Sequence, residues 1–249
     1  MLSIRNLSYE VTGEKGKIKI LDNISVDIKK GSFTVITGPN GSGKTTLAKA
    51  IMGLASPKTG KMSGSIVFNG KELMNLSVTE RAKLGISYGF QQPPRFKGIS
   101  VTDLLSIAAG KILSRDEHCS YLSQVGLCTD VYLNREIDSG LSGGELKRIE
   151  IATLLARDAS LMMFDEPEAG IDLWSFAKLT EIFGTIHKRK RDTTIIIISH
   201  QERIIRLADE IILIKSGAVA DRGSSGEILP HIIEDTVTEC TYLEGAANE

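Results

Sequence analysis

The sequence has few cysteines, and their spacing excludes two kinds of site. Among 249 residues there are three, Cys119, Cys128 and Cys240, and no two of them form a C-x-x-C pair. An odd number of cysteines without that spacing indicates neither a disulfide framework nor a zinc site. We therefore expect a protein of the reducing cytoplasm.

Long hydrophobic runs are also missing. No stretch approaches the roughly 18 apolar residues that a membrane-spanning helix needs. The opening "MLSIRNLSYE" has no basic segment followed by an apolar one, so it does not resemble a secretory signal. We expect a chain that does not insert into a membrane, and any role at a membrane would come through a partner.

An excess of charge of either sign is absent. Lys and Arg number 30 against 31 Asp and Glu, a net charge of −1, which gives no electrostatic reason to expect nucleic acid as a partner. The one basic run, "HKRKR" at 187–191, fits the C-terminal end of a helix that begins near Leu173. A nucleic-acid patch is the alternative interpretation of this run.

The most informative stretch that is present is "TGPNGSGKTT" at 37–46, which has the spacing G-x-x-x-x-G-K-T. It follows an apolar segment, Phe33–Thr37, that reads as a buried strand, and it precedes "TTLAKAIMGL", where Leu47, Ile51 and Leu54 share a helical face. The loop therefore joins a strand to a helix N-terminus, where free backbone N–H groups and the helix dipole favour an anion.

The residue types of this loop suit a nucleoside triphosphate. Glycine lets the backbone wrap a phosphate, Lys44 would reach the β- and γ-phosphates, and the Thr45 hydroxyl would bind Mg²⁺. The alternative is a glycine-rich turn with a surface lysine. The residues expected to contact ATP are Gly38, Pro39, Asn40, Gly41, Ser42, Gly43, Lys44, Thr45 and Thr46.

The rest of the chain predicts an α/β fold organised as one domain over residues 1–249. Strand-like segments with turns fill the first 70 residues and indicate an antiparallel β region. Residues 93–156 read as a helical insert, in which Ser100 caps a helix with apolar residues at 101, 104, 105, 108 and 112. Residues 1–92 and 157–249 would form the nucleotide-binding core, where buried strands alternate with helices as in a parallel sheet.

A second polar cluster ends the apolar strand "LMMFDE". Buried acids at the end of a strand are unfavourable unless they serve a cation or a proton. Asp165 suits Mg²⁺ and Glu166 suits the polarisation of an attacking water; a solvated turn is the alternative.

A third cluster, "LSGGE" at 141–145, precedes a helix in which Leu146, Ile149, Ala152 and Leu155 share one side. Ser142, Gly143 and Gly144 would form a second helix N-terminus with free N–H groups. A second anion site in the insert, far from the first, favours a head-to-tail dimer in which each such loop covers the γ-phosphate held by the other subunit. The alternative is that Ser142 is only a helix cap.

The phosphate loop, "LSGGE", "FDE" and "IIIISH", in this order, resemble the ATP-binding-cassette (ABC) ATPases across essentially the whole chain. The resemblance implies a P-loop, RecA-like core with a parallel sheet, an antiparallel β region and a helical insert, with ATP and Mg²⁺ as ligands. It also implies the loop 142–145, including Glu145, as an ATP contact.

The resemblance assigns four further residues. It implies that Tyr9 stacks on adenine, that Gln91 contacts Mg²⁺ and the attacking water, that Asp172 contacts the opposite subunit, and that His200 contacts the γ-phosphate. Taken singly, Tyr9 reads equally well as a strand aromatic, Gln91 or its neighbour as a loop amide, and His200 as a polar cap. The catalytic set is then Lys44, Gln91, Glu166 and His200, and the metal set is Thr45, Gln91 and Asp165.

Within the ABC ATPases the chain looks most like the Suf-system iron–sulfur cluster assembly ATPases (SufC). Leu141, Ile149 and Pro167 depart from that pattern. The matching positions are Leu76-Ser77, Arg81-Ala82, Gly85-Ile86, Phe90-Gln91, Pro93, Gly98-Ile99-Ser100, Asn134-Arg135, Lys147-Arg148, Glu150-Ile151 and Arg203-Ile204.

Three functions follow as hypotheses. The first is an ATPase that remodels a soluble scaffold of the SufB/SufD type, contacted through residues 91–100 with Phe96 as an apolar anchor. The second is the ATP-binding subunit of a transporter. The third is a nucleotide-gated adaptor with little turnover, which the presence of both Glu166 and His200 argues against.

Overall fold

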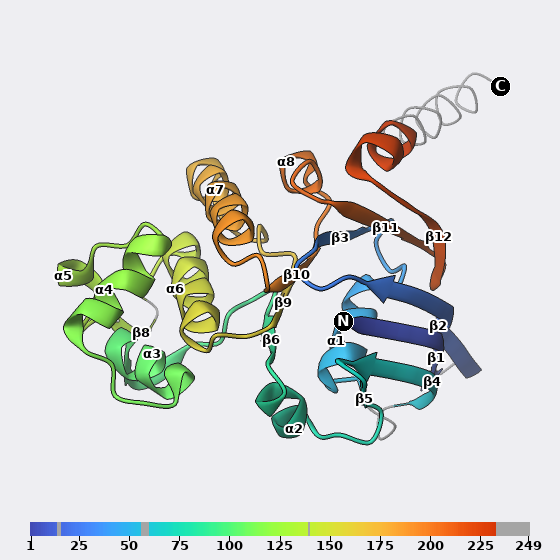
Figure 1. Cartoon of the computed structure of the whole chain (residues 1–249), viewed down its shortest axis with the longest axis horizontal. Coiled ribbons are helices and arrows are strands. Elements are labelled where there is room, and N and C mark those ends of the chain that lie inside the picture. Colours follow the sequence, from blue (N-terminus) through green and yellow to red (C-terminus); the bar gives the residue numbers. More distant parts are fainter. Residues whose placement is uncertain (14–15, 56–59, 139, 233–249) are drawn as a thin grey trace.

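A sheet of six strands forms the centre of the computed structural model, which describes residues 1–13, 16–55, 60–138 and 140–232 (Figure 1). Its order is β12-β11-β3-β10-β9-β6; the pairs from β11 to β6 are parallel, and β12 is antiparallel to β11. The strands are β3 (Phe33–Thr37), β6 (Ile86–Gly89), β9 (Leu161–Asp165), β10 (Thr194–Ile198), β11 (Glu210–Lys215) and β12 (Ala218–Gly223).

The central strands are mostly apolar and buried along their whole length because both faces of the sheet are covered. Every residue of β3, β9 and β10 is buried, as expected for a parallel sheet between two layers. Alternate side chains point to opposite faces. One face contributes Phe33, Val35, Met162, Phe164, Ile195 and Ile197 to the first hydrophobic core, and the other contributes Ile36, Met163, Ile196 and Ile198 to the second.

The second core is closed by an antiparallel sheet and by the helix after the phosphate loop. The sheet has the order β2-β1-β4-β5 and stands to the right of the central sheet in Figure 1. These elements are β1 (Leu2–Gly13), β2 (Gly16–Ile28), β4 (Lys61–Phe68), β5 (Lys71–Glu72) and α1 (Lys44–Met52). The antiparallel β region predicted for the first 70 residues is confirmed.

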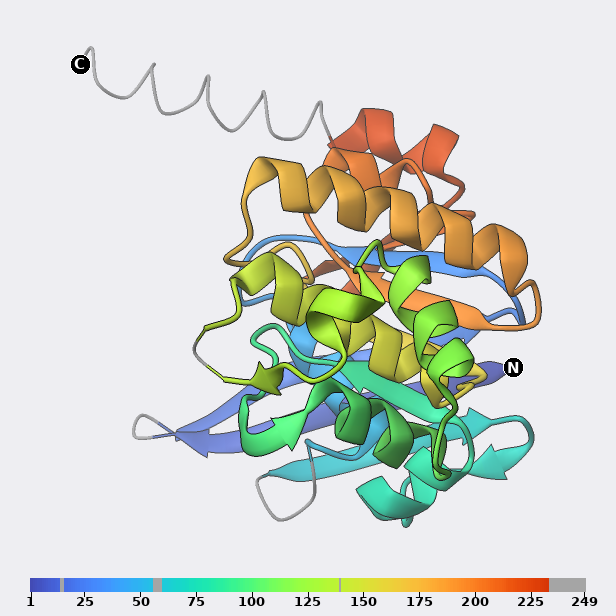
Figure 2. The same cartoon turned by 90° about the vertical axis from the view of Figure 1, so that its left-hand side faces the viewer.

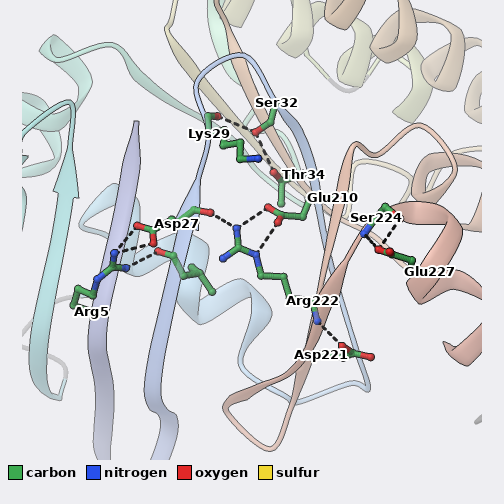
Figure 3. A network of polar contacts seen from close by, with 11 residues as sticks. Arg5, Asp27, Lys29, Ser32, Thr34, Glu210, Asp221, Arg222, Ser224 and Glu227 are labelled. Atoms are coloured by element: carbon green, nitrogen blue, oxygen red, sulfur yellow. Dashed lines mark hydrogen bonds and ion pairs between the residues drawn. The ribbon is translucent and has the colours of Figure 1, made fainter.

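Polar contacts join the two sheets at their edges (Figure 3). Arg222 on β12 donates to Glu210 on β11 at 2.7 Å and also to the backbone oxygen of Asp27 on β2. The Asp27 carboxylate accepts from Arg5 on β1 at 2.7 and 2.8 Å. The hydrogen bond from Arg5 is the largest cause that lowers the pKa of Asp27. One chain of hydrogen bonds thus spans β1, β2, β12 and β11.

A helical layer packs on the opposite side of the central sheet and covers the first core. Figure 2 shows this side, with the insert facing the viewer and α7 lying above it. The helices are α3 (Val101–Ala109), α4 (Arg115–Gln124), α5 (Thr129–Tyr132), α6 (Gly143–Ala156), α7 (Leu173–Arg189) and the short α8 (Glu202–Ile205). Capping boxes begin α3 at Ser100, α4 at Ser114 and α6 at Ser142.

Local glycines end two helices earlier than their apolar pattern suggests. Gly110, at φ 68°, ends α3, so the predicted helical position Ile112 lies beyond it with 94% of its surface exposed. Gly53, at φ 83°, ends α1 before Leu54, which is 38% exposed. Both glycines adopt the left-handed conformation that commonly ends a helix.

The insert also contains a small sheet that the sequence did not indicate. β7 (Phe96–Ser100) pairs with β8 (Glu136–Ile137) in antiparallel orientation. The helix predicted to begin near Leu173 does so, and His187, Lys188 and Arg189 occupy its last turn, where cations are favoured. This agrees with the helix-end interpretation of the basic run.

Arg81 on α2 (Val78–Lys83) caps the C-terminal end of α1 from inside the protein. The residue is 4% exposed, and its Nη1 donates to the backbone oxygens of Ala50 and Ile51 at 2.6 and 2.9 Å. Arg81→Met would leave both carbonyls without this donor, so we expect the free energy of unfolding to fall by about 2 kcal/mol. Urea denaturation measures this, with Lys83→Met, on the exposed side of the same helix, as the control. Equal midpoints for the two variants would contradict the capping role.

Among the residues that the structure describes, no helix is both long enough and apolar enough to span a lipid bilayer. Cys119 and Cys128 are exposed and carry free thiols, while Cys240 lies outside the described residues.

Candidate active site

The phosphate loop forms one wall of a pocket at the N-terminal end of α1. Gly38, Gly41 and Gly43 have φ values of 138°, 76° and 101°, which glycine adopts without strain. A Cβ atom on Gly38 would lie 1.9 Å from the oxygen of Ile214, so no other residue fits there. The pocket is lined by Ile20, Asn40, Gly41, Gly43, Lys44, Thr45, Thr46 and Glu166.

Lys44 closes the loop on itself. Its side chain is 4% exposed, and Nζ donates to the backbone oxygens of Gly38 and Pro39 at 2.7 and 2.8 Å. Burial lowers the pKa of Lys44, while the carboxylates of Glu166 and Asp165 act to raise it. The ammonium group is therefore fixed at the pocket wall with incomplete charge compensation.

Thr45 and Asp165 bring a hydroxyl and a buried carboxylate together. The Thr45 hydroxyl donates to Oδ1 of Asp165 at 2.8 Å, and the Tyr88 hydroxyl donates to Oδ2 at 2.7 Å. Asp165 is 2% exposed at the end of β9, and Tyr88 lies on the neighbouring β6. Burial, together with the hydrogen bond to Asp165, raises the pKa of Tyr88, so its hydroxyl stays protonated.

Glu166, the next residue, contacts two other predicted site residues. Its Oε2 accepts from Nε2 of Gln91 at 2.6 Å, and its Oε1 lies 3.8 Å from Nε2 of His200. Burial is the main cause that lowers the pKa of His200; the charge of Lys44 acts in the same direction and that of Glu166 opposes it. The imidazole is therefore neutral at neutral pH, with one N–H group to donate.

The backbone of Glu166 is in an uncommon conformation. Its φ is 43°, in the left-handed region that non-glycine residues seldom adopt. The N–H of Glu166 donates to the oxygen of Ile198 at 3.0 Å, which holds the turn against β10. Such strain is most often found at functional sites.

The predicted second anion loop and Asp172 form one surface outside this pocket. A Cβ atom on Gly144 would lie 2.3 Å from Oγ of Ser175, and one on Gly143 would lie 2.8 Å from the oxygen of Gly170. The loop 142–145 therefore packs directly against the start of α7. Asp172 caps that helix, because its Oδ1 accepts from the N–H groups of Trp174 and Ser175 at 2.9 and 3.0 Å.

Glu145 is engaged in the capping box of α6. Its Oε2 accepts from the N–H of Ser142 at 2.7 Å, and its Oε1 accepts from the Tyr132 hydroxyl. Burial acts to raise the pKa of Glu145, but these hydrogen bonds outweigh it and bring the pKa to about 2. None of residues 142–145 lines the pocket. Within one chain, the two groups of predicted ATP contacts are separate.

Tyr9 requires a correction. The alternation of β1 points Leu7 and Tyr9 into the second core, and Tyr9 is only 4% exposed. It does not line the pocket, where the apolar side chain is that of Ile20 on β2. With only this small part of its surface exposed, Tyr9 does not present a face for adenine in this structure.

Two contributions were missed at the level of sequence. Tyr88 was not singled out, although it anchors Asp165, because a tyrosine in an apolar strand gives no sign of its partner. Lys147 and Glu150 were noted only as family-like positions, yet they hold the backbone of Phe90 and Gln91. Their spacing on one helical face was the available signal.

The residues present fit ATP and Mg²⁺. Besides the glycine loop and Lys44, the buried hydroxyl of Ser42 has no protein hydrogen-bond partner. In the described part of the chain no cluster of three or more His, Cys, Asp or Glu side chains could hold a metal ion. Mg²⁺ in nucleotide sites is bound by few protein groups together with phosphate oxygens and water, so Thr45 and Asp165 are a sufficient protein contribution.

Comparison with known proteins shows the family to which the chain belongs. Residues 21–169 match the ABC transporter family. An uncharacterized ABC transporter ATP-binding protein of Methanocaldococcus jannaschii, MJ0035, is 34% identical over 235 residues, which cover 92% of each chain. A probable branched-chain amino acid transport ATP-binding protein of Archaeoglobus fulgidus, LivF, is 34% identical over 86% of this chain and 90% of its own.

The fold has a close counterpart among solved structures. The dimeric post-hydrolysis state of the ATP-binding cassette MJ0796, bound to ADP and Pi, superimposes with a TM-score of 0.79 at 23% identity, covering 90% of this chain and 99% of that one. The predicted fold class is thereby confirmed. The chain belongs to the ABC transporter family and is an ABC ATPase.

Proposed function

We propose that this protein is the ATP-binding subunit of an ABC transporter, which binds and hydrolyses MgATP in a head-to-tail homodimer. The arrangement of Lys44, Thr45 and Glu166 around one pocket, with Asp165 hydrogen-bonded to Thr45, carries the proposal. In this proposal Lys44 and the N–H groups of the loop bind the β- and γ-phosphates. Thr45 and Asp165 hold Mg²⁺, which neutralises developing charge on the phosphates.

Glu166 is the group that polarises the attacking water. Its carboxylate is fixed from one side by the Gln91 amide and faces His200 on the other. The neutral His200 is an N–H donor for the γ-phosphate, since its lowered pKa keeps a proton on only one ring nitrogen. The amide oxygen of Gln91 can bind the attacking water or the metal ion, since its NH₂ group is the part that donates to Glu166.

The homodimer is supported by the position of the second loop. The N-termini of α6 and α7, of which Ser142 and Asp172 are the caps, lie together on a surface outside the pocket. The N–H groups at the start of α7 are bonded to Asp172, whereas Ser142 and Gly143 at the start of α6 are exposed, and a helix N-terminus favours an anion. A second subunit, rotated by 180°, would present this surface to the pocket and complete two shared sites. The dimeric form of the MJ0796 cassette with ADP and Pi fits this arrangement.

The partner surface adjoins the segment that carries Gln91. A largely apolar hollow lies between α1, α2, β6, α3 and α6, and its lining includes the exposed side chains of Leu54 and Phe90. Phe96 in β7 is 36% exposed nearby in sequence. A membrane subunit of a transporter is the proposed occupant, because the relatives are transport ATP-binding proteins by name. The protein would then act at the cytoplasmic face of that subunit.

A second candidate is supported by particular residues. The Suf-like positions around Gln91, such as Arg81-Ala82 and Gly98-Ile99-Ser100, favour a soluble scaffold of the SufB/SufD type instead. The same surface would serve either partner. The two candidates therefore share the ATPase activity and differ in the partner that binds near Gln91.

Purification of bound partners from both the cytosolic and the detergent-solubilised fraction of cells separates the candidates. We expect wild type to recover an integral membrane protein and Phe96→Asp to lose it, because a charge at an apolar contact disrupts binding. Val131→Asp, at an apolar side chain of α5 that is 60% exposed and does not belong to the segment 91–100, is the control and should retain it. A soluble scaffold recovered instead, and lost in Phe96→Asp, would overturn the transporter proposal in favour of the scaffold.

A further inference from the structure

Helix α6 carries a buried ion pair that has no role in the active site as described above. Lys147 and Glu150 are one helical turn apart, with side chains 2% and 9% exposed, and Nζ lies 3.0 Å from Oε2. By contrast, the Lys178–Glu181 pair on α7 has the same spacing and distance but exposures of 49% and 69%. Burying two charges is unfavourable by several kcal/mol per ion unless further hydrogen bonds compensate.

The compensating hydrogen bonds all go to the backbone of Phe90 and Gln91. Oε1 of Glu150 accepts from the N–H of Phe90 at 2.8 Å. Nζ of Lys147 donates to the oxygen of Phe90 and, at 3.4 Å, to that of Gln91. The pair therefore binds the backbone N–H and C=O groups of Phe90 and also the C=O group of Gln91.

These hydrogen bonds to α6 take the place of strand-to-strand hydrogen bonds at the point where strand β6 ends. Strand β6 stops at Gly89, so the following residues have no neighbouring strand to bond with. A Cβ atom on Gly89 would lie 2.7 Å from the Phe164 ring and 3.4 Å from Oε2 of Glu150. Glycine at this position therefore leaves room for the Phe164 ring, while a Cβ atom would only just reach contact with the Glu150 carboxylate.

The gripped segment leads directly into the active site. The side chain of Gln91 extends from it and donates to Glu166 at 2.6 Å. Helix α6 itself begins about one turn before Lys147, at the loop 142–145. One helix thus carries the loop proposed to face the other subunit and the charges that hold the backbone of Gln91.

We propose that Lys147 and Glu150 form a latch that positions Gln91 against Glu166, so that the placement of α6 sets the geometry of hydrolysis. Both charges are fixed to the same turn of α6, so a displacement of this helix carries the backbone of Phe90 and Gln91 with it. The Gln91 amide then moves relative to Glu166. The latch is a positioning device: neither side chain lines the pocket. The inference rests on the proposed roles of Gln91 and Glu166.

The double variant Lys147→Met/Glu150→Leu tests the latch, since it removes both charges together and leaves no unpaired one inside. We expect kcat for ATP hydrolysis to fall by about ten- to a hundredfold, the upper value being the loss for a catalytic group displaced by about 1 Å, with KM for ATP within about twofold of wild type. Amide exchange of Phe90 should become faster, because its acceptor is lost. The matched control, Lys178→Met/Glu181→Leu, removes the exposed pair and should leave kcat unchanged.

A double-mutant cycle with Gln91→Ala distinguishes the latch from a purely structural pair. If the latch acts through Gln91, its removal in the Gln91→Ala background lowers kcat no further. An equal fold-loss in both backgrounds, or an unchanged kcat with faster Phe90 exchange, would overturn the inference. If Gln91→Ala alone leaves kcat at the wild-type value, the proposed role of Gln91 fails, and the latch fails with it. If the double variant does not fold, Lys147→Gln/Glu150→Gln, which removes both charges but keeps polar side chains, is carried through the same cycle.

Discussion

Glu166→Gln is expected to bind ATP as tightly as wild type and to hydrolyse it at least about a hundredfold more slowly. The amide keeps the size of the side chain and an oxygen that can still accept from Gln91, which now donates at 2.6 Å. What is lost is the negative charge that polarises the attacking water. Binding survives because Lys44, Thr45 and the loop glycines are unchanged.

Slow turnover should also make the ATP-bound dimer accumulate. A nucleotide held between two subunits contributes to their association for as long as it is not hydrolysed. Trp174 offers a direct signal: it is the one tryptophan of the chain, it is 84% exposed, and it lies two residues after Asp172 on the proposed dimer surface. We expect its fluorescence to change with MgATP in Glu166→Gln, in parallel with a shift to dimer in size-exclusion chromatography.

Glu181→Gln, at an exposed glutamate on α7 with 69% of its side chain accessible, is the control and should hydrolyse ATP at the wild-type rate. A variant at Glu166 that remains monomeric at every ATP and protein concentration would contradict the shared site. One that retains the wild-type turnover would contradict the role of Glu166 itself.

The core of the fold could be predicted because its strands are buried on both faces. "FTVIT", "LMMFD" and "TIIII" are mostly apolar segments, and each is a central strand with every residue buried. Helix starts were equally legible, since Ser100 and Ser142 carry capping boxes that depend only on residues within the same turn. Short-range chemistry decides these features, so the sequence contains them.

Features that depend on tertiary contacts were predicted less well. Strand β6 is only four residues long, and the sequence pattern predicts no separate strand at 86–89. The side chain of Tyr9 was predicted to lie at the ATP site, but the alternation of β1, which bears shifts in its register with β2, turns it into the core. A motif fixes which residue types occur, whereas only the assembled sheet fixes which face they point to.

The site shows the same division. Lys44, Thr45 and Glu166 were predicted and line one pocket, and Asp165, also predicted, accepts a hydrogen bond from Thr45. The phosphate loop after β3 and the end of β9 lie at the same edge of the parallel sheet, with β10 between the two strands. The anchors Tyr88 and Lys147 are not marked in the sequence. Each acts through a hydrogen bond to a residue distant in the chain, at separations of 77 and 57 positions.

Lys44→Ala is expected to weaken ATP binding at least about a hundredfold. The side chain is 4% exposed, so its charge acts on the phosphates with little screening by water. Its removal also leaves the oxygens of Gly38 and Pro39, now bonded at 2.7 and 2.8 Å, without a donor in the wall of an anion site. Two carbonyl oxygens, each with a partial negative charge, would then face the triphosphate where a cation had been.

Isothermal titration with ATP measures this loss, and Lys49→Ala is the matched control. Lys49 lies on the exposed side of the same helix α1, in its last turn, so its removal takes away the same charge without touching the pocket. We expect Lys49→Ala to bind ATP like wild type, and both variants to retain the wild-type circular dichroism spectrum. If Lys44→Ala bound ATP with unchanged affinity, the loop at 37–46 would not be the phosphate site, and Glu166 and His200 would have no γ-phosphate to act on.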